Sequence, residues 1–165
     1  MRWLRFTVFL LVITVIQAGL IERLGITALN IKPNLHLVIL VFFAIYGTPS
    51  EAIITSFVIG FMADITAPPM GPHTIAYGIF GAAIGYLHAV AAMRYWLSQA
   101  IAIFISGLLT GLLVYMLSRL KGLSSENAAA VIFGASVYSA AIGPLLFRPF
   151  IWWMRIKSNR LSKYR

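Results

Sequence analysis

The chain has 165 residues, of which 61% are hydrophobic and only 10% are charged, and its mean hydropathy is +0.91. A soluble domain carries roughly 25% charged residues, so this composition excludes a water-soluble domain of this size. Thirteen Lys and Arg residues oppose four Asp and Glu residues, but the basic residues gather at the chain ends and form no stripe with aromatic residues. That distribution favours orientation in a membrane over nucleic-acid binding. The lack of Cys excludes disulfides and Cys-based metal sites.

Six apolar segments predict an all-α membrane protein with about six transmembrane helices. A helix needs about 20 apolar residues to cross a hydrocarbon core of about 30 Å. The predicted spans are, in chain order, 6–21, 35–46, 52–63, 74–92, 100–117 and 128–146. They form a single transmembrane domain, 1–154, which is followed by a basic cytoplasmic tail, 155–165.

The first segment also has features of a signal peptide. Arg2 and Arg5 precede the apolar run, and small residues follow Gln17 at its end. However, the A-x-A cleavage pattern is absent and further spans follow, so we expect this segment to be retained.

The second and third segments are short and are separated only by the breaker cluster 47–51. Their shortness leaves two alternatives to separate spans over 35–63, namely one broken span or a re-entrant hairpin. With six spans both termini are cytoplasmic, and the inside segments hold eight basic residues against four outside. The inside residues are Arg2, Arg5, Arg94, Arg155, Lys157, Arg160, Lys163 and Arg165, and the outside residues are Arg23, Lys32, Arg119 and Lys121. This asymmetry favours six spans over one broken span, whereas a hairpin returning to its own side would give the same count.

Asp64 is the residue with the strongest candidate chemistry. It ends the apolar run from Gly60 and precedes a proline-rich loop. A carboxylate at the edge of a membrane is a candidate ion ligand, proton relay or partner contact. The alternative is structural, with the carboxylate hydrated or accepting hydrogen bonds from backbone N–H groups at the start of the next helix. We favour the structural interpretation.

No other pattern predicts catalysis, a metal site or a cofactor. The spacing of His36, His73 and His88 does not place three or four ligands together. Neither a G-x-S-x-G elbow nor a phosphate-binding G-x-x-x-x-G-K-[ST] loop is present. We therefore expect a protein that is not an enzyme.

Small residues at helical spacing predict close helix packing. Gly81 and Gly85 form one G-x-x-x-G motif, and Gly107 and Gly111 form another. Such faces let helix backbones approach closely in lipid, either within this chain, which we favour, or against a partner's helix. Pro144 is expected to kink the last span. The predicted packing residues are Gly78, Gly81, Gly85, Gly107, Gly111, Gly143 and Pro144.

With these residues in view, the chain resembles the MreD family of bacterial rod shape-determining membrane proteins. Lys32-Pro33-Asn34 is similar to the family's start of the second span, and Gly60 to Ile65 is similar to its glycine-rich stretch ending in Asp and Leu or Ile. Gly71 stands seven residues after Asp64, as in the family, and a Pro-containing last span precedes a basic tail. The sequence departs from the family at Met62-Ala63 and in its proline-rich loop.

The resemblance implies a non-enzymatic scaffold in the bacterial inner membrane that helps to position lateral peptidoglycan synthesis. Its implied partners are the single-span protein MreC and, indirectly, MreB, RodA and the penicillin-binding transpeptidase of RodA. The implied fold is similar to the substrate-binding membrane subunits of ECF-type transporters. The family-motif residues, which are also candidate partner contacts, are Pro33, Asn34, Gly60, Asp64 and Gly71. With MreC as the partner that the resemblance implies, we expect a small-residue helix face and the outer loop 64–73 to hold its transmembrane helix and juxtamembrane region.

The sequence leaves two alternative functions. A vitamin-type binding subunit of a transporter would have the same helix count, but it needs several convergent polar groups in a pocket. The candidates are Gln17, Thr55, Ser56, Asp64, Tyr77, His88, Ser106 and Thr110. An intramembrane enzyme would need a nucleophile–base pair or metal ligands at one depth, which the sequence does not assemble.

Overall fold

A computed structural model describes residues 3–19, 31–66, 71–88, 95–122 and 127–154. Within these ranges the chain forms six α-helices and no β-strand, which confirms the predicted all-α class. The helices are α1 (Trp3–Gly19), α2 (Leu35–Tyr46), α3 (Pro49–Thr66), α4 (Pro72–His88), α5 (Trp96–Leu120) and α6 (Ala128–Met154).

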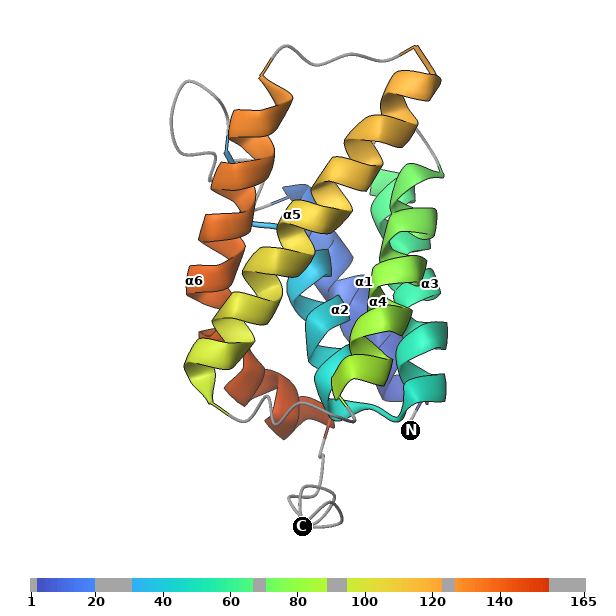
Figure 1. The fold of residues 1–165 in the computed structure, drawn as a ribbon. Helices are drawn as coiled ribbons and strands as arrows, with labels where there is room; N and C mark the ends of the chain where they lie inside the picture. Colours follow the sequence, from blue (N-terminus) through green and yellow to red (C-terminus); the bar gives the residue numbers. More distant parts are fainter. Residues whose placement is uncertain (1–2, 20–30, 67–70, 89–94, 123–126, 155–165) are drawn as a thin grey trace.

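Successive helices run in opposite directions along one bundle (Figure 1). The start of α1, the α2–α3 turn, the start of α5 and the end of α6 all lie at the lower end in this view. The end of α3 and the start of α4 lie at the upper end. We refer to these as the lower and upper ends below.

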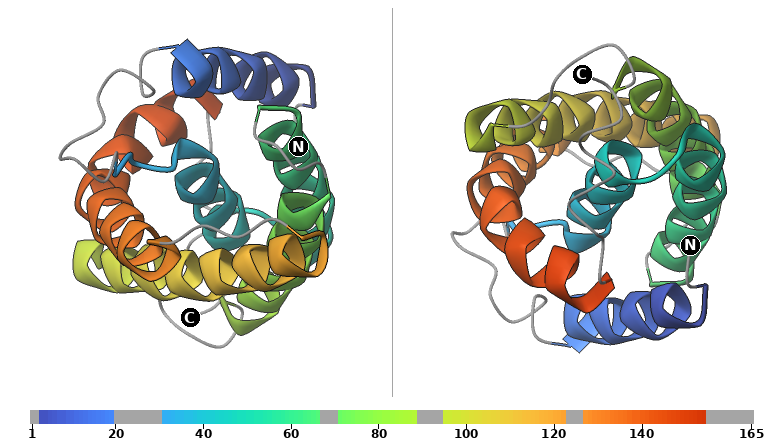
Figure 2. Two further views of the ribbon diagram at one scale, coloured as in Figure 1. Left: turned by 90° about the horizontal axis from the view of Figure 1, so that it is seen from above. Right: turned by 90° about the horizontal axis from the view of Figure 1, so that it is seen from below.

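The central element is α2, and the other helices surround it (Figure 2). All residues of α2 from Leu35 to Ile45 are buried. A helix that is apolar all round is suited to such a position, because no face of it gains from solvent. This short helix therefore forms the middle of the core, although 35–46 and 52–63, with 12 residues each, were the two weakest of the predicted spans.

The residues between α2 and α3 do more than end α2, because they also cap the start of α3. The Oγ1 atom of Thr48 accepts from the backbone N–H of Glu51 at 3.3 Å, and Glu51 Oε2 accepts from the Thr48 N–H at 3.0 Å. This reciprocal pair is a capping box, with Pro49 at the first helical position where its missing N–H costs nothing. As a result α3 begins at Pro49, three residues before the predicted start, and runs antiparallel to α2 (Figure 1). A single broken helix through 35–63 is therefore wrong.

The helices match the predicted segments in number and order, and most are longer. The bounds of α2 coincide with the predicted 35–46. By contrast, α5 extends past both ends of the predicted 100–117, and α6 extends past the end of the predicted 128–146. The predicted ends at 21 and 92 fall outside the described residues. By length and composition, α5 and α6 are each suited to crossing a membrane, and α1 and α2 are shorter apolar helices.

The outer surface of the bundle is apolar. Large hydrophobic side chains are exposed on α1, α3, α4, α5 and α6. Examples from these helices in chain order are Leu11, Val15, Phe61, Ile79, Ile101, Leu112, Phe133 and Leu145. A soluble helix bundle would place polar residues on these faces, so an apolar surface of this kind is typical of a membrane-associated protein.

Each predicted packing glycine lies against another helix of the same chain. On α4, a Cβ atom at Gly78, Gly81 or Gly85 would overlap side chains of α3, which lie at Phe57, Ser56 and Ala52 respectively. On α5 and α6, the neighbouring side chains are Ser136 and Leu37 for Gly107, Ile132 for Gly111, and Ile103 and Val38 for Gly143. These small residues thus let the chain's own helices approach closely.

The last helix continues through two prolines. Pro144 and Pro149 both lie within α6, which ends at Met154 and not at the predicted 146. Its last turns run at an angle to the rest of the helix (Figure 1). Proline removes a backbone donor and clashes with the preceding turn, so this bend agrees with the kink predicted at Pro144.

Candidate functional site: the polar junction of α2, α3 and α4

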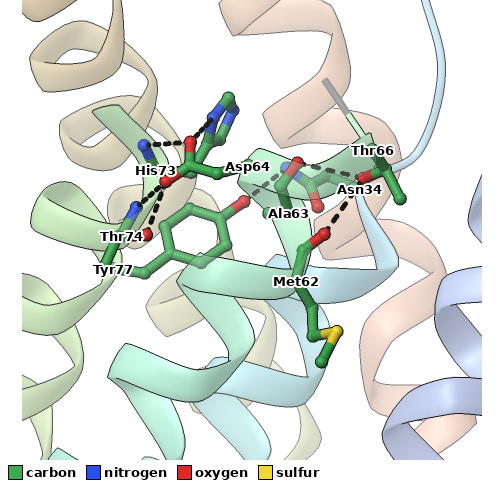
Figure 3. Close-up of polar contacts among 8 residues, drawn as sticks. All are labelled: Asn34, Met62, Ala63, Asp64, Thr66, His73, Thr74 and Tyr77. Atoms are coloured by element: carbon green, nitrogen blue, oxygen red, sulfur yellow. Dashed lines mark hydrogen bonds and ion pairs between the residues drawn. The ribbon is translucent and has the colours of Figure 1, made fainter. Parts of the chain in front are cut away.

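Five polar residues from three helices meet at the start of α4, near the upper end of the bundle (Figure 3). We call this cluster the polar junction and define it as Asn34, Asp64, His73, Thr74 and Tyr77. It contains two of the five predicted family-motif residues, and the other three lie directly beside it.

Asp64 caps α4 from the neighbouring helix. Its side chain is 3% exposed, and its Oδ1 accepts from the His73 backbone N–H at 3.0 Å. Its Oδ2 accepts from the Thr74 backbone N–H at 2.8 Å and from the Thr74 hydroxyl at 2.5 Å. The Nδ1 atom of His73 lies 3.0 Å from Oδ1. The first N–H groups of a helix have no partner within it, so the carboxylate satisfies two that would otherwise be buried and unpaired.

The geometry favours the structural interpretation of Asp64. Both oxygens accept hydrogen bonds, which suits an ionised carboxylate, and the positive end of the α4 dipole stabilises that charge. Pro72, at the first position of α4, has no N–H to leave unsatisfied. The carboxylate is therefore occupied by the protein itself.

Two glycines bring α3 close enough to α4 for this contact. Gly60 lies one helical turn before Asp64 on the same face of α3. A Cβ at Gly60 would lie 2.7 Å from Thr74 Cα and 2.8 Å from the His73 carbonyl oxygen, both backbone atoms. Gly71 has φ of +112°, a conformation that other residues rarely adopt, and it leads the chain into α4. Glycine is thus required at both positions by the backbone.

Asn34 joins α2 to two other helices. Its Oδ1 accepts from the Leu37 N–H at 3.1 Å, which caps the start of α2. Its Nδ2 donates to the Tyr77 hydroxyl on α4 at 2.7 Å, and its backbone N–H donates to Ser139 Oγ on α6 at 2.8 Å. Tyr77 is 1% exposed, so this hydroxyl needs a protein partner.

A ring contact connects the two halves of the junction. The rings of His73 and Tyr77 meet edge to face with centroids 5.8 Å apart. Hydrogen bonds and this ring contact therefore connect Asn34 through Tyr77 and His73 to Asp64 without a break (Figure 3).

Thr66, drawn beside the junction in Figure 3, is bonded within its own helix: its hydroxyl donates to the Ala63 carbonyl at 3.0 Å at the end of α3.

The last turns of α1 attach to the same region. The Gln17 side chain donates to the Pro33 carbonyl at 3.2 Å and accepts from the Leu35 N–H at 2.9 Å. Thr14 Oγ1 lies 3.2 Å from Nε2 of the buried His36. The helix expected to be retained rather than cleaved thus fixes the start of the central helix.

Sequence reasoning identified Asn34 and Asp64 but missed most of their partners. Ser139, which accepts from the Asn34 backbone N–H, carries no motif, because its role depends only on which way α6 faces. Thr74 was detectable in principle, since a hydroxyl in the first turn of a helix is a common capping group.

All but one of the polar residues proposed for a carrier pocket are bonded within the protein, and the side chain of the remaining one, His88, lies outside the described part of the chain. The hydroxyls of Thr55, Ser56, Ser106 and Thr110 each donate to a carbonyl of their own helix. Gln17, Asp64 and Tyr77 are engaged as described above. Among the residues that the structure describes, no group of three His, Asp or Glu side chains comes together. These contacts leave few polar groups with which to bind a vitamin-sized ligand.

Fold and junction together define a helical, membrane-associated protein whose internal polar groups position its own helices. A comparison with protein-family models matches residues 1–157 to the family described as rod shape-determining protein MreD. The chain belongs to the MreD family, and the predicted resemblance is confirmed. Comparisons with curated proteins and with solved structures each give no match.

Proposed function

We propose that this chain is a non-enzymatic scaffold of the bacterial elongation machinery that crosses the cytoplasmic membrane six times and binds MreC. The observation that carries the proposal is the family match over residues 1–157, which assigns a role in rod shape determination. In this proposal the scaffold helps to position lateral peptidoglycan synthesis by RodA and its transpeptidase partner, with an indirect link to MreB.

The state of Asp64 supports a non-enzymatic role. Among the described residues, Asp64 is the one acidic residue of the polar junction, and both its oxygens accept hydrogen bonds from α4. A proton relay or ion ligand needs a carboxylate with an oxygen available to the transported species. Asp64 instead contributes to the relative placement of α3 and α4.

The antiparallel bundle supports a multi-pass arrangement with both termini on one side. The start of α1 and the end of α6 share the lower end (Figure 1). Exposed aromatic residues gather at the helix termini of that end, as in the interfacial belts of membrane proteins. They are Trp3, Tyr95, Trp96, Trp152 and Trp153.

For the partner, the packing glycines point to a revised contact. Gly78, Gly81 and Gly85 face α3, so we place the transmembrane helix of MreC on an exposed apolar face instead. The segment between Asp64 and His73, two residues of the polar junction, would then meet the juxtamembrane region of MreC outside the membrane.

Co-purification tests this function. Full-length MreC from the same organism is expressed with this chain, tagged and purified in mild detergent, and the two are expected to elute together. The matched control is MreC whose transmembrane helix is replaced by an unrelated apolar span, which should retain less of this chain. Failure of intact MreC to retain the chain would refute the proposed scaffold.

A further inference from the structure

We infer that residues 145–154, the part of α6 after Pro144, lie along the inner surface of the membrane at headgroup level. We call this part the interfacial segment. The surface that it contacts is the lipid headgroup layer. The inference rests on the membrane embedding proposed above and adds a fixed contact between the protein and one leaflet.

The length of α6 motivates the inference. Its 27 residues would span about 40 Å at about 1.5 Å per residue, which exceeds a hydrocarbon core of about 30 Å. Residues 128–144 alone account for about 25 Å. After the bend, the last turns run across the lower end of the bundle towards α1 (Figures 1 and 2). The segment thus changes course near the depth at which the membrane would end.

One face of the interfacial segment is anchored to the bundle. Phe147, Phe150 and Met154 recur at helical spacing and are buried. Phe147 and Phe150 meet Phe42 of α2 at centroid distances of 5.4 and 5.5 Å, and Phe150 meets Phe9 of α1 at 4.8 Å. Edge-to-face aromatic contacts of this kind fix ring orientation, so the segment is held against both α1 and α2.

The opposite face suits lipid headgroups. Trp152 is 79% exposed, and Trp153 and Arg148 are also exposed. Trp rings favour the boundary between headgroups and acyl chains, and an Arg side chain extends its charge to the phosphate level. By contrast, the exposed face of α5 carries aliphatic residues beyond its first turn, such as Ile101 and Ile105. Five Lys and Arg residues follow in 155–165, which favours the cytoplasmic leaflet.

Depth measurement with spin labels tests the inference. Because the chain has no Cys, single Cys residues can be placed at the exposed positions Val137, Ala141, Leu145 and Trp152. The full chain is reconstituted in vesicles of phosphatidylethanolamine and phosphatidylglycerol. The accessibility of each nitroxide to oxygen and to a water-soluble nickel chelate then gives its depth. Labels at Leu97, Ile101 and Ile105 on α5 provide the control of a helix without proline.

The expected profile has two parts. Between Val137 and Ala141 the depth should change by up to about 6 Å, as along the control helix. Between Leu145 and Trp152 it should change by less than about 5 Å, with both labels near headgroup level. A continued steady change that takes Trp152 about 10 Å further out, into water, would overturn the inference alone. Lack of oxygen accessibility at Val137 and Ile101 would instead overturn the proposed embedding.

Discussion

The side-chain amide of Asn34 donates a hydrogen bond of 2.7 Å to the hydroxyl of Tyr77, 43 residues further along the chain. The same Asn34 side chain caps α2 through the Leu37 N–H. One residue therefore satisfies a backbone N–H group at the start of the central helix and also joins that helix to α4. In lipid, where apolar burial does not distinguish one helix neighbour from another, such polar contacts contribute to the specific arrangement of helices.

Because of the Asn34–Tyr77 bond, we predict that substitutions of these two residues have non-additive effects on the free energy of unfolding. Tyr77→Phe should lower the free energy of unfolding by about 1 kcal/mol, because only the hydroxyl is lost. Asn34→Ala should cost about 2 kcal/mol, since the cap of α2 is lost as well. The double variant should cost less than the sum, because both changes remove the same bond. Unfolding in mild detergent measures these values, and Tyr86→Phe at an exposed tyrosine is the control. Strict additivity would contradict the predicted coupling.

The cap formed by Asp64 predicts an order among three variants. Asp64→Ala should destabilise by about 2 to 3 kcal/mol, because charged hydrogen bonds to the N–H groups of His73 and Thr74 are lost. Asp64→Asn should cost less, since one amide oxygen still accepts while the NH2 group faces a donor. Thr74→Val should cost about 1 kcal/mol, through loss of a single hydroxyl. The measurement is again unfolding in detergent.

Cell shape separates a capping role of Asp64 from a chemical one. If Asp64 is a cap, rod shape in complemented cells should follow the amount of folded protein for all three variants. A stable, normally abundant Asp64→Asn protein that fails to restore rod shape would indicate a chemical role instead.

The close approach at Gly60 predicts that alanine is not tolerated there. A Cβ would meet backbone atoms of His73 and Thr74, which move only if α3 and α4 separate. We expect Gly60→Ala to cost about 1 to 3 kcal/mol, as for overpacking in other cores. Gly78→Ala is the matched control, because its Cβ would meet the ring of Phe57, a half-exposed side chain that is able to rotate away. Equal losses for the two variants, measured by thermal unfolding, would argue against a backbone contact at Gly60.

The six-span proposal predicts opposite labelling at the two ends of the bundle. Ser50 is exposed beside the α2–α3 turn at the lower end, and Asn127 is exposed at the start of α6 at the upper end. In intact cells, a membrane-impermeant thiol reagent should label Asn127→Cys and leave Ser50→Cys unlabelled until the membrane is opened. Labelling of both from outside would contradict six spans and favour a hairpin by α2 and α3.

Several parts of this fold were predictable because they depend on local chemistry. Low charge content predicted the membrane class, and the apolar run 35–46 predicted the bounds of α2, which the breaker cluster after Tyr46 ends. A kink was predicted at Pro144 from the loss of one backbone donor, and the last turns of α6, which contain Pro144 and Pro149, do run at an angle to the rest of the helix. The start of α3 was missed although it is local, because Thr48 and Glu51 were interpreted as part of a breaker rather than as a capping box.

The sequence by itself determined the all-α, membrane-associated class of this protein, the number and order of its helices, and its family. Only the tertiary structure decided that α2 lies at the centre, that Asn34 meets Tyr77 and Ser139, and that the packing glycines face the chain's own helices. The physical reason is that the exposed and the buried faces of these helices are both apolar, so hydrophobic periodicity does not show which side of a helix points inward. The partners of a polar group then depend on the rotation and crossing of whole helices, as for Asn34 and Ser139, which are 105 residues apart.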